Sequence, residues 1–150
     1  MKIEKANISQ TDVIIQLLKE LYLELGEEES SIVYLKNELI EEMLDSLQTE
    51  IYLVFNHNNE AIGIATFTQC QSIYAGGKYG LIDEMYIKPG YRSKSIGSLI
   101  IDTIKAIGKE KGWKRIDVTA PVEERWKRTV DFYEKCGFTF TGPKLKLQLI

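Results

Sequence analysis

Residues 84–113, EMYIKPGYRSKSIGSLIIDTIKAIGKEKGW, constrain the fold more than any other stretch of this chain. A strand pattern runs into Pro-Gly, and a basic loop of small residues follows. Apolar residues then recur at helical spacing, as Ile96, Leu99, Ile100, Ile104 and Ile107. A further strand is expected at residues 115–119. A strand, a helix and a second strand in this order predict a crossover between parallel strands.

The rest of the chain adds strands and helices on both sides of this crossover. Before it we expect a strand, two helices and then three antiparallel strands, at residues 2–6, 9–26, 31–47, 51–55, 61–70 and 79–87. After it we expect a helix and two strands, at residues 123–136, 138–141 and 144–150. The order β-α-α-β-β-β-α-β-α-β-β predicts an α/β fold, a mixed sheet flanked by about four helices. With 150 residues, a single domain spanning residues 1–150 is expected.

Several classes of protein are disfavoured by what the sequence lacks. No apolar run is long enough to span a membrane, and the first residues do not resemble a signal peptide, so a cytoplasmic protein without membrane contact is expected. Cys70 and Cys136 stand alone, so no metal site is expected. The one histidine, His57, lies in an Asn-rich turn, FNHNNEAIG, where we expect it to be solvated rather than catalytic.

Charge is divided unevenly along the chain. Residues 1–87 hold fifteen Asp or Glu and five Lys or Arg, whereas residues 88–150 hold seven and fourteen. Such asymmetry suggests two partners of opposite sign, although solvated helix faces would explain most of these charges. A nucleic-acid partner is disfavoured because acidic residues interrupt the basic half and the net charge is −3.

The basic loop at residues 92–97 has the chemistry of an anion site. The first turn of a helix carries N–H groups without internal partners, and the helix dipole adds partial positive charge there. Ser95 and Gly97 are small enough for close approach, and Arg92 and Lys94 can add countercharge. A basic turn capped by Ser95 is an equally good interpretation of the loop alone. The glycine patterns of P-loops and dinucleotide sites are absent.

Two motifs make the chain resemble the GNAT N-acetyltransferases. RSKSIG, with Arg92, Ser95 and Gly97, is similar to motif A of that family, [RQ]-x-x-G-x-[GA], and the preceding MYIKPGY matches the family's approach to it. FYEKCGF, residues 132–138, resembles the family's helix-to-strand signature and puts Tyr133 at its tyrosine position. The resemblance covers the whole chain, from Ile3 to Leu149, and implies a sheet whose two central parallel strands splay apart.

The resemblance implies acetyl-CoA as the acyl donor. Its pantetheine arm would pair with the backbone of Met85, Tyr86 and Ile87, and Lys94, Lys127 and Arg128 are candidates for its 3′-phosphate. Its pyrophosphate would lie on the loop and the first helical turn, formed by Arg92, Ser93, Lys94, Ser95, Ile96, Gly97 and Ser98. Two departures matter: Ser95 replaces the usual Gly, which is costly if that position needs positive φ. Trp126 replaces an Asn that touches the cofactor in many members, and we expect Trp126 to pack or to line the cleft.

The implied reaction is direct attack of a primary amine on the thioester. A lysine-like amine, with a pKa of ~10.4, must lose a proton first, which costs roughly 4–5 kcal/mol at pH 7. Asp83 and Glu84 are the candidate bases; strict alternation would put them on opposite faces of the strand, and Glu84 is preferred. A backbone N–H near Met85 would stabilise the oxyanion. The family pattern makes Tyr133 the acid for the leaving thiolate, whereas a core tyrosine is the alternative.

The acceptor and the assembly are less constrained. The predicted first two helices are strongly acidic, which favours a cationic acceptor such as a polyamine, an aminoglycoside-like amine or a lysine side chain, of small-molecule or peptide origin. Two solvated helices would look the same. A non-catalytic CoA-binding sensor or regulatory module remains the alternative function. The period-two pattern of KLKLQLI, residues 144–150, suggests an edge strand that could join two subunits in a homodimer.

Overall fold

The computed structural model describes residues 1–120 and 123–150. Within these residues one sheet has five strands in the order β1-β2-β3-β4-β5. The first four strands pair antiparallel, and β5 pairs parallel to β4. The strands are β1 (Lys2–Lys5), β2 (Thr49–Phe55), β3 (Ala61–Ser72), β4 (Gly77–Ile87) and β5 (Ile116–Val118), and the helices are α1 (Thr11–Glu24), α2 (Asn37–Asp45), α3 (Ile96–Lys111) and α4 (Lys127–Lys135).

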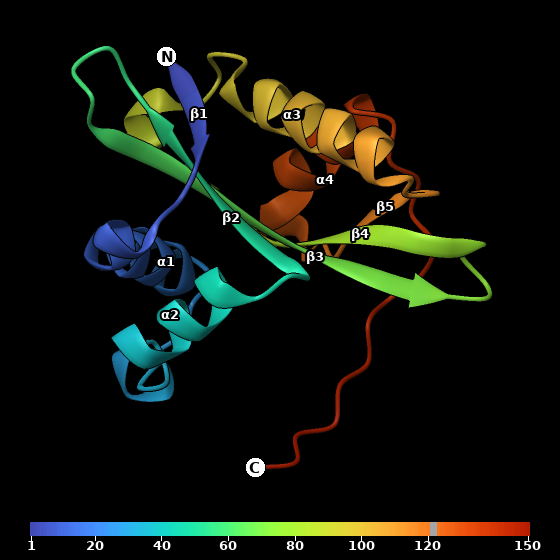
Figure 1. Ribbon diagram of the computed structural model, residues 1–150, viewed down its shortest axis with the longest axis horizontal. Coiled ribbons are helices and arrows are strands. Elements are labelled where there is room, and N and C mark those ends of the chain that lie inside the picture. Colours follow the sequence, from blue (N-terminus) through green and yellow to red (C-terminus); the bar gives the residue numbers. More distant parts are fainter. Residues whose placement is uncertain (121–122) are drawn as a thin grey trace.

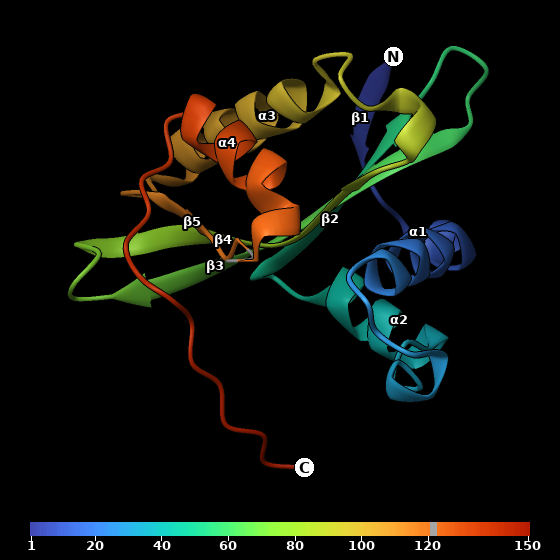
Figure 2. The same ribbon diagram turned by 180° about the vertical axis from the view of Figure 1, so that it is seen from behind.

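The helices cover the two faces of the sheet in pairs. Helices α1 and α2 lie on one face, and α3 and α4 lie on the other, as the two opposite views show (Figures 1 and 2). Each face has its own core: Leu17 and Ile64 belong to the cluster under α1, whereas Phe67 and Ile100 belong to the cluster under α3. The α/β class, the mixed sheet and the crossover helix between β4 and β5 confirm the fold predicted from sequence.

Helix α2 differs from the predicted helix over residues 31–47. It begins only at Asn37, and the preceding residues form a single 3-10 turn, Glu29–Ser31. Within this helix Ile40 is buried and Leu39 is exposed, and Leu47, which follows the helix end at Asp45, is also exposed. The spacing of Leu35, Leu39, Met43 and Leu47 also predicts one apolar stripe. Leu35 and Met43 do pack against the core, but the prediction was wrong at Leu39, which is exposed, and at Leu47, which lies outside the helix.

The two strands predicted after α4 are not formed. Residues 138–150, all of them described, have no strand pairing and run as an extended tail away from the sheet (Figure 1). Leu145, Leu147 and Leu149 are 92%, 81% and 87% exposed. A period-two pattern becomes a strand only when it bonds to a neighbouring strand, and these residues pair with none of the described strands.

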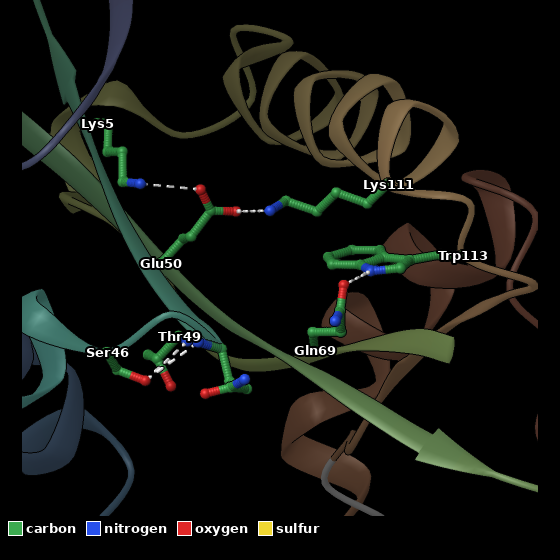
Figure 3. A network of polar contacts seen from close by, with 8 residues as sticks. Lys5, Ser46, Thr49, Glu50, Gln69, Lys111 and Trp113 are labelled. Carbon is green, nitrogen blue, oxygen red and sulfur yellow. Dashed lines mark hydrogen bonds and ion pairs between the residues drawn. The ribbon is translucent and has the colours of Figure 1, made fainter. Parts of the chain in front are cut away.

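Polar contacts tie the far end of α3 to the sheet (Figure 3). Glu50 on β2 forms ion pairs with Lys5 of β1 at 3.1 Å and with Lys111 of α3 at 3.8 Å. Trp113, just after α3, donates from Nε1 to Gln69 Oε1 on β3 at 2.8 Å. Its ring fills the space over Gly80, where an added Cβ would come within 2.2 Å of Trp113 Cζ3. Side-chain packing therefore closes the paired segment of β4 and β5 at its Gly80 end.

Candidate active site

Strands β4 and β5 separate after the pair Ile82 and Val118, at the other end of their paired segment. They pair only from Gly80 with Ile116 to Ile82 with Val118, while β4 continues to Ile87. A cavity of about 530 Å³ lies beside this unpaired part of β4. Its lining comes from both faces of the sheet, including Leu21 and Glu24 of α1 and Phe132 and Tyr133 of α4. The splay expected from the resemblance is thus present, and it connects the two faces.

The unpaired half of β4 offers backbone groups to this cavity. Lys88 N–H bonds back to Ile62 O, and Tyr86 is paired with Ile64. Because residues along a strand alternate in direction, the N–H groups of Met85 and Ile87 point to the open edge. The Ile87 carbonyl confirms this direction, since it accepts a bond from Arg92 Nε at 2.8 Å.

A β-bulge brings the two candidate bases to the same face. Thr66 is opposite Glu84 and Phe67 is opposite Ile82, which leaves Asp83 as the extra residue in β4. Asp83 accepts from Thr68 Oγ1 at 2.6 Å, and Glu84 accepts from Thr66 Oγ1. The prediction of opposite faces was wrong, because a bulge interrupts the alternation on which it rested. Both carboxylates face the α1 side of the sheet.

Glu84 is the more enclosed of the two carboxylates. Its Oε1 accepts from Tyr22 Oη of α1 at 2.8 Å, and its backbone N–H donates to Thr66 Oγ1 at 3.1 Å. Burial raises the pKa of Glu84, against the opposing effect of the Thr66 and Tyr22 hydrogen bonds, and nearby Asp83 raises it further. Burial likewise raises the pKa of Asp83 and of Tyr22. A carboxylate with a raised pKa is better matched to accepting a proton near neutral pH.

Tyr133 reaches the cavity from the opposite face. It is 9% exposed, and its Oη lies 4.0 Å from Met85 Sδ on β4. Burial, with a smaller effect from Cys136, raises the pKa of Tyr133 to about 12. The phenol therefore holds its proton at neutral pH and can donate it. Tyr133 also packs against Phe132 and Phe138, so the core and functional interpretations are compatible.

The loop before α3 has left-handed backbone at two serines. Ser95 is the N-cap of α3 with φ +63° and ψ +11°, and Ser93 also has φ +63°. The position where the family most often has Gly thus needs positive φ in this chain. The packing of α4 requires glycine at position 97, because an added Cβ would lie 2.8 Å from Phe132 Cζ of α4. Ser93, Ser95, Ile96, Gly97 and Ser98 all line the cavity.

The charges around the loop differ from the sequence-based expectation. Arg92 does not lie along the loop, because its guanidinium pairs with Glu24 of α1 and stands over the Tyr86 ring. Lys94 lies over the Tyr91 ring and is not part of the cavity lining. Arg128 of α4 donates to Ser93 Oγ and lines the cavity, whereas Lys127 pairs with Asp131. Arg128 therefore brings positive charge to the loop beside Ser93.

The structure brings most of the predicted site residues together. The unpaired β4 segment, the loop and Tyr133 line one cavity, and Trp126 joins them from the 3-10 turn Glu124–Trp126. His57 is exposed in its turn, as predicted. Sequence reasoning did not find the contacts that Tyr22, Thr66 and Glu24 make with Glu84 or Arg92 from more than a dozen residues away. No local pattern could have found those contacts.

A second cavity, of about 680 Å³, lies along the outer edge of β5. Its lining runs from Arg115 to Ala120 and from Cys136 to Lys144. It shares Val118, Thr119 and Tyr133 with the first cavity but has none of the loop residues and neither Asp83 nor Glu84. The smaller cavity is therefore the candidate active site.

Comparison with known proteins identifies the family. The pattern of the Acetyltransferase (GNAT) family matches residues 12–138. This chain belongs to the GNAT acetyltransferase family. It is 31% identical over 83 residues to glucosamine 6-phosphate N-acetyltransferase 1 of Dictyostelium discoideum, a match that covers 55% of this chain and 50% of that protein. The chain thus spans about half the length of this curated relative.

Solved structures share the fold across the full chain. A transcriptional regulator from Bacillus halodurans C-125 has a TM-score of 0.82 at 20% identity, covering 99% of each chain. An aminoglycoside acetyltransferase, meta-AAC0020, from an uncultured soil metagenomic sample has a TM-score of 0.79 at 17% identity, covering 99% of this chain and 95% of that one. At these identities the likeness concerns the fold. Within the described residues no helix is long and apolar enough to cross a membrane.

Proposed function

We propose that this protein is an acetyl-CoA-dependent N-acetyltransferase. The observation that carries the proposal is the cavity at the splay, where an open strand edge, a helix N-terminus and a buried tyrosine meet. The family membership supports the same activity. Acetyl-CoA supplies the acetyl group as an activated thioester.

The residues present suit such a donor. The Met85 and Ile87 N–H groups point to the open edge. That of Ile87 can bond to an amide-containing arm as a strand does, which leaves that of Met85 for the thioester carbonyl. The first turn of α3 supplies N–H groups for a pyrophosphate, and Arg128 adds positive charge beside Ser93. Trp126 supplies an aromatic wall. These groups bind and orient the donor from the α3–α4 side of the sheet.

Proton transfers fall to groups on the two faces. Glu84, held by Tyr22 and Thr66, accepts the proton of the amine on the α1 side, with Asp83 as the neighbouring alternative. The Met85 N–H donates to the negative charge that develops on the carbonyl oxygen. Tyr133, neutral at pH 7, donates its proton to the leaving sulfur from the α4 side. In this proposal the base and the acid act from opposite faces of the sheet.

We propose a primary amine on a cationic small molecule or peptide as the acceptor. Of the described cavity-lining residues, Glu24, Asp83 and Glu84 are acidic, and all three are on the α1 side. The names of two relatives refer to glucosamine 6-phosphate and to aminoglycosides, both of which carry amines. An acceptor screen should therefore begin with amino sugars and aminoglycosides, and then test polyamines and lysine peptides.

Titration calorimetry with acetyl-CoA tests this proposal. We expect micromolar-range binding by the wild type. Ser98→Glu puts a carboxylate on the exposed first turn of α3, inside the cavity lining, and should weaken binding by about tenfold or more through charge repulsion. Ala106→Glu is the matched control, because it adds the same charge to an exposed site further along α3 and should bind as the wild type does. Absence of wild-type binding at high concentration would refute the proposal.

A non-catalytic CoA-binding module is the second candidate. The serine at position 95, where the family most often has Gly, and the tryptophan at position 126, where many members have Asn, both depart from the family pattern. This candidate gives the same calorimetric result but no turnover. Release of free CoA thiol with any amine of the screen would exclude it, and binding without release across the whole screen would favour it.

We also propose that the tail takes part in a homodimer. Leu145, Leu147 and Leu149 alternate and are exposed, and the outer edge of β5 has no partner strand within the described residues. A tail from a second subunit could bond to that edge. Truncation after Pro143 should then give a monomer by light scattering. A truncated protein that stays dimeric would rule out this route.

A further inference from the structure

The ion pair between Glu24 and Arg92 joins the two halves of the candidate site. Glu24 is the last residue of α1, on the acceptor side, and Arg92 begins the loop that leads into α3. Their contact is bidentate, with Arg92 Nη1 to Glu24 Oε1 at 2.8 Å and Arg92 Nη2 to Glu24 Oε2 at 2.9 Å. Both residues line the cavity. Glu24 of α1 thus neutralises the charge of Arg92 in the loop.

Arg92 is held at the point where β4 ends and the loop begins. Its Nε donates to Ile87 O at 2.8 Å, and its guanidinium stands 5.5 Å from the centre of the Tyr86 ring. A guanidinium has five N–H groups. The bond to Ile87 and the two bonds to Glu24 use three of these N–H groups, so two remain for another acceptor near the loop.

The ion pair between Arg92 and Glu24 is well suited to the replacement of Glu24 by another anion. The side chains of Arg92 and Glu24 are 37% and 32% exposed, and ion pairs with that much solvent contribute little net free energy. A phosphate offers the same bidentate geometry as a carboxylate and carries more charge. An anion bound at the first turn of α3 would therefore compete with Glu24 for Arg92.

We propose that Glu24 is a positioning residue that holds Arg92 away from the anion site of the loop until the phosphates of CoA take its place. The inference rests on the proposed function, because it assumes that CoA phosphates bind this loop. Binding of CoA then frees the Glu24 carboxylate and loosens the end of α1. The acceptor side of the cavity, which α1 lines with Leu21, Glu24 and Leu25, changes only after CoA has bound.

Calorimetry with CoA as the probe tests this coupling. Glu24→Gln should bind CoA roughly three- to fivefold more tightly than the wild type, because Arg92 no longer has a competing carboxylate. Glu20→Gln is the matched control: it removes the same charge one turn earlier on α1, where the carboxylate contacts Tyr86 Oη at 3.1 Å and not Arg92. It should bind CoA within about twofold of the wild type, since long-range charge alone is screened. Thermal melts establish that each variant is folded.

A double-mutant cycle isolates the role of Arg92. In the Arg92→Gln background, adding Glu24→Gln should leave CoA affinity unchanged, because the partner that Glu24 holds is already gone. Glu24→Gln that binds CoA like the wild type or more weakly would overturn the inference, and so would a gain that persists without Arg92. If wild type and Glu24→Gln both fail to bind CoA, the proposed function falls as well. A wild type that binds, with an unchanged variant, overturns only the role of Glu24.

Discussion

The two halves of strand β4 differ in what lies beside them. From Gly80 to Ile82 the strand is paired with β5, and the Trp113 ring covers Gly80. From Asp83 to Ile87 that edge is open to the cavity, and carboxylates, hydroxyls and Tyr133 gather around it. Strand β4 thus contributes to folding stability where it is paired and to the candidate active site where its edge is open. The bulge at Asp83 separates the two parts.

The open half should be the more sensitive one in activity. Glu84→Gln removes the preferred base and should lower kcat by about 10³-fold, with little change in CoA affinity. Thiol-release kinetics and calorimetry measure the two effects separately. If Asp83→Asn is the variant with the larger loss, the neighbouring carboxylate is the base instead.

The same variant has an expected effect on stability. The folded-state pKa of Glu84 is raised by burial, so the folded protein binds the proton more readily than the unfolded chain. The cost of burying the charge is therefore present above the folded pKa and disappears as the pH falls through it. Glu84→Gln should be more stable than the wild type in urea at pH 7, and the difference should shrink at acidic pH.

The closed half should be the more sensitive one in folding. Gly80→Ala would place a Cβ 2.2 Å from Trp113 Cζ3 and should lower the free energy of unfolding by about 3 kcal/mol. Gly90→Ala, where no atom lies within 4 Å of the added Cβ, should change it little. Urea denaturation of both variants checks this. Equal stabilities would show that the Trp113 packing is looser than described.

Tyr133→Phe probes the open half from the α4 face. Loss of the phenol proton donor should reduce kcat by about 10²-fold, less than loss of the base. The control is Tyr79→Phe on the closed half of β4, which should retain full activity. Because burial raises the pKa of Tyr133 to about 12, wild-type activity should not fall through ionisation of this group below about pH 10. A loss of activity between pH 8 and 9 that Tyr133→Phe abolishes would contradict the assignment.

The smallest expected effect concerns the loop. Ser95→Gly relieves a left-handed backbone that costs a non-glycine residue roughly 1–2 kcal/mol, partly offset by the entropy of glycine, so a net gain of up to about 1 kcal/mol is expected. Ser98→Gly, in the first helical turn, should instead lose stability by a similar amount. Melting temperatures of the two variants decide whether Ser95 is strained.

Sequence reasoning was strongest where structure is local. The hairpin of β2 and β3, the strand β4 and the start and end of α3 follow from alternation, helical spacing and glycine; Gly112, for example, ends α3 with φ +76°. The motif identified Ser95 as the position where positive φ would be costly, and the structure shows that Ser95 does have positive φ.

What could not be predicted depends on contacts between distant segments. The bulge at Asp83 has no signature in the residues around it, and it reversed the inferred face of one carboxylate. Tyr22, which bonds to Glu84, and Glu24, which pairs with Arg92, both lie on α1, more than 60 residues from their partners. The tail shows the same limit, since its alternating pattern predicts a strand but cannot supply the partner strand that it needs.

Amide hydrogen exchange along β4, with and without acetyl-CoA, tests the central claim most directly. If the open half binds the donor, the Met85 and Ile87 amides should exchange more slowly in the complex, while Gly80 and Ile82 should be unchanged because β5 already covers them. Unchanged exchange at Met85 and Ile87 under saturating acetyl-CoA would contradict the assignment of this strand edge as the donor site.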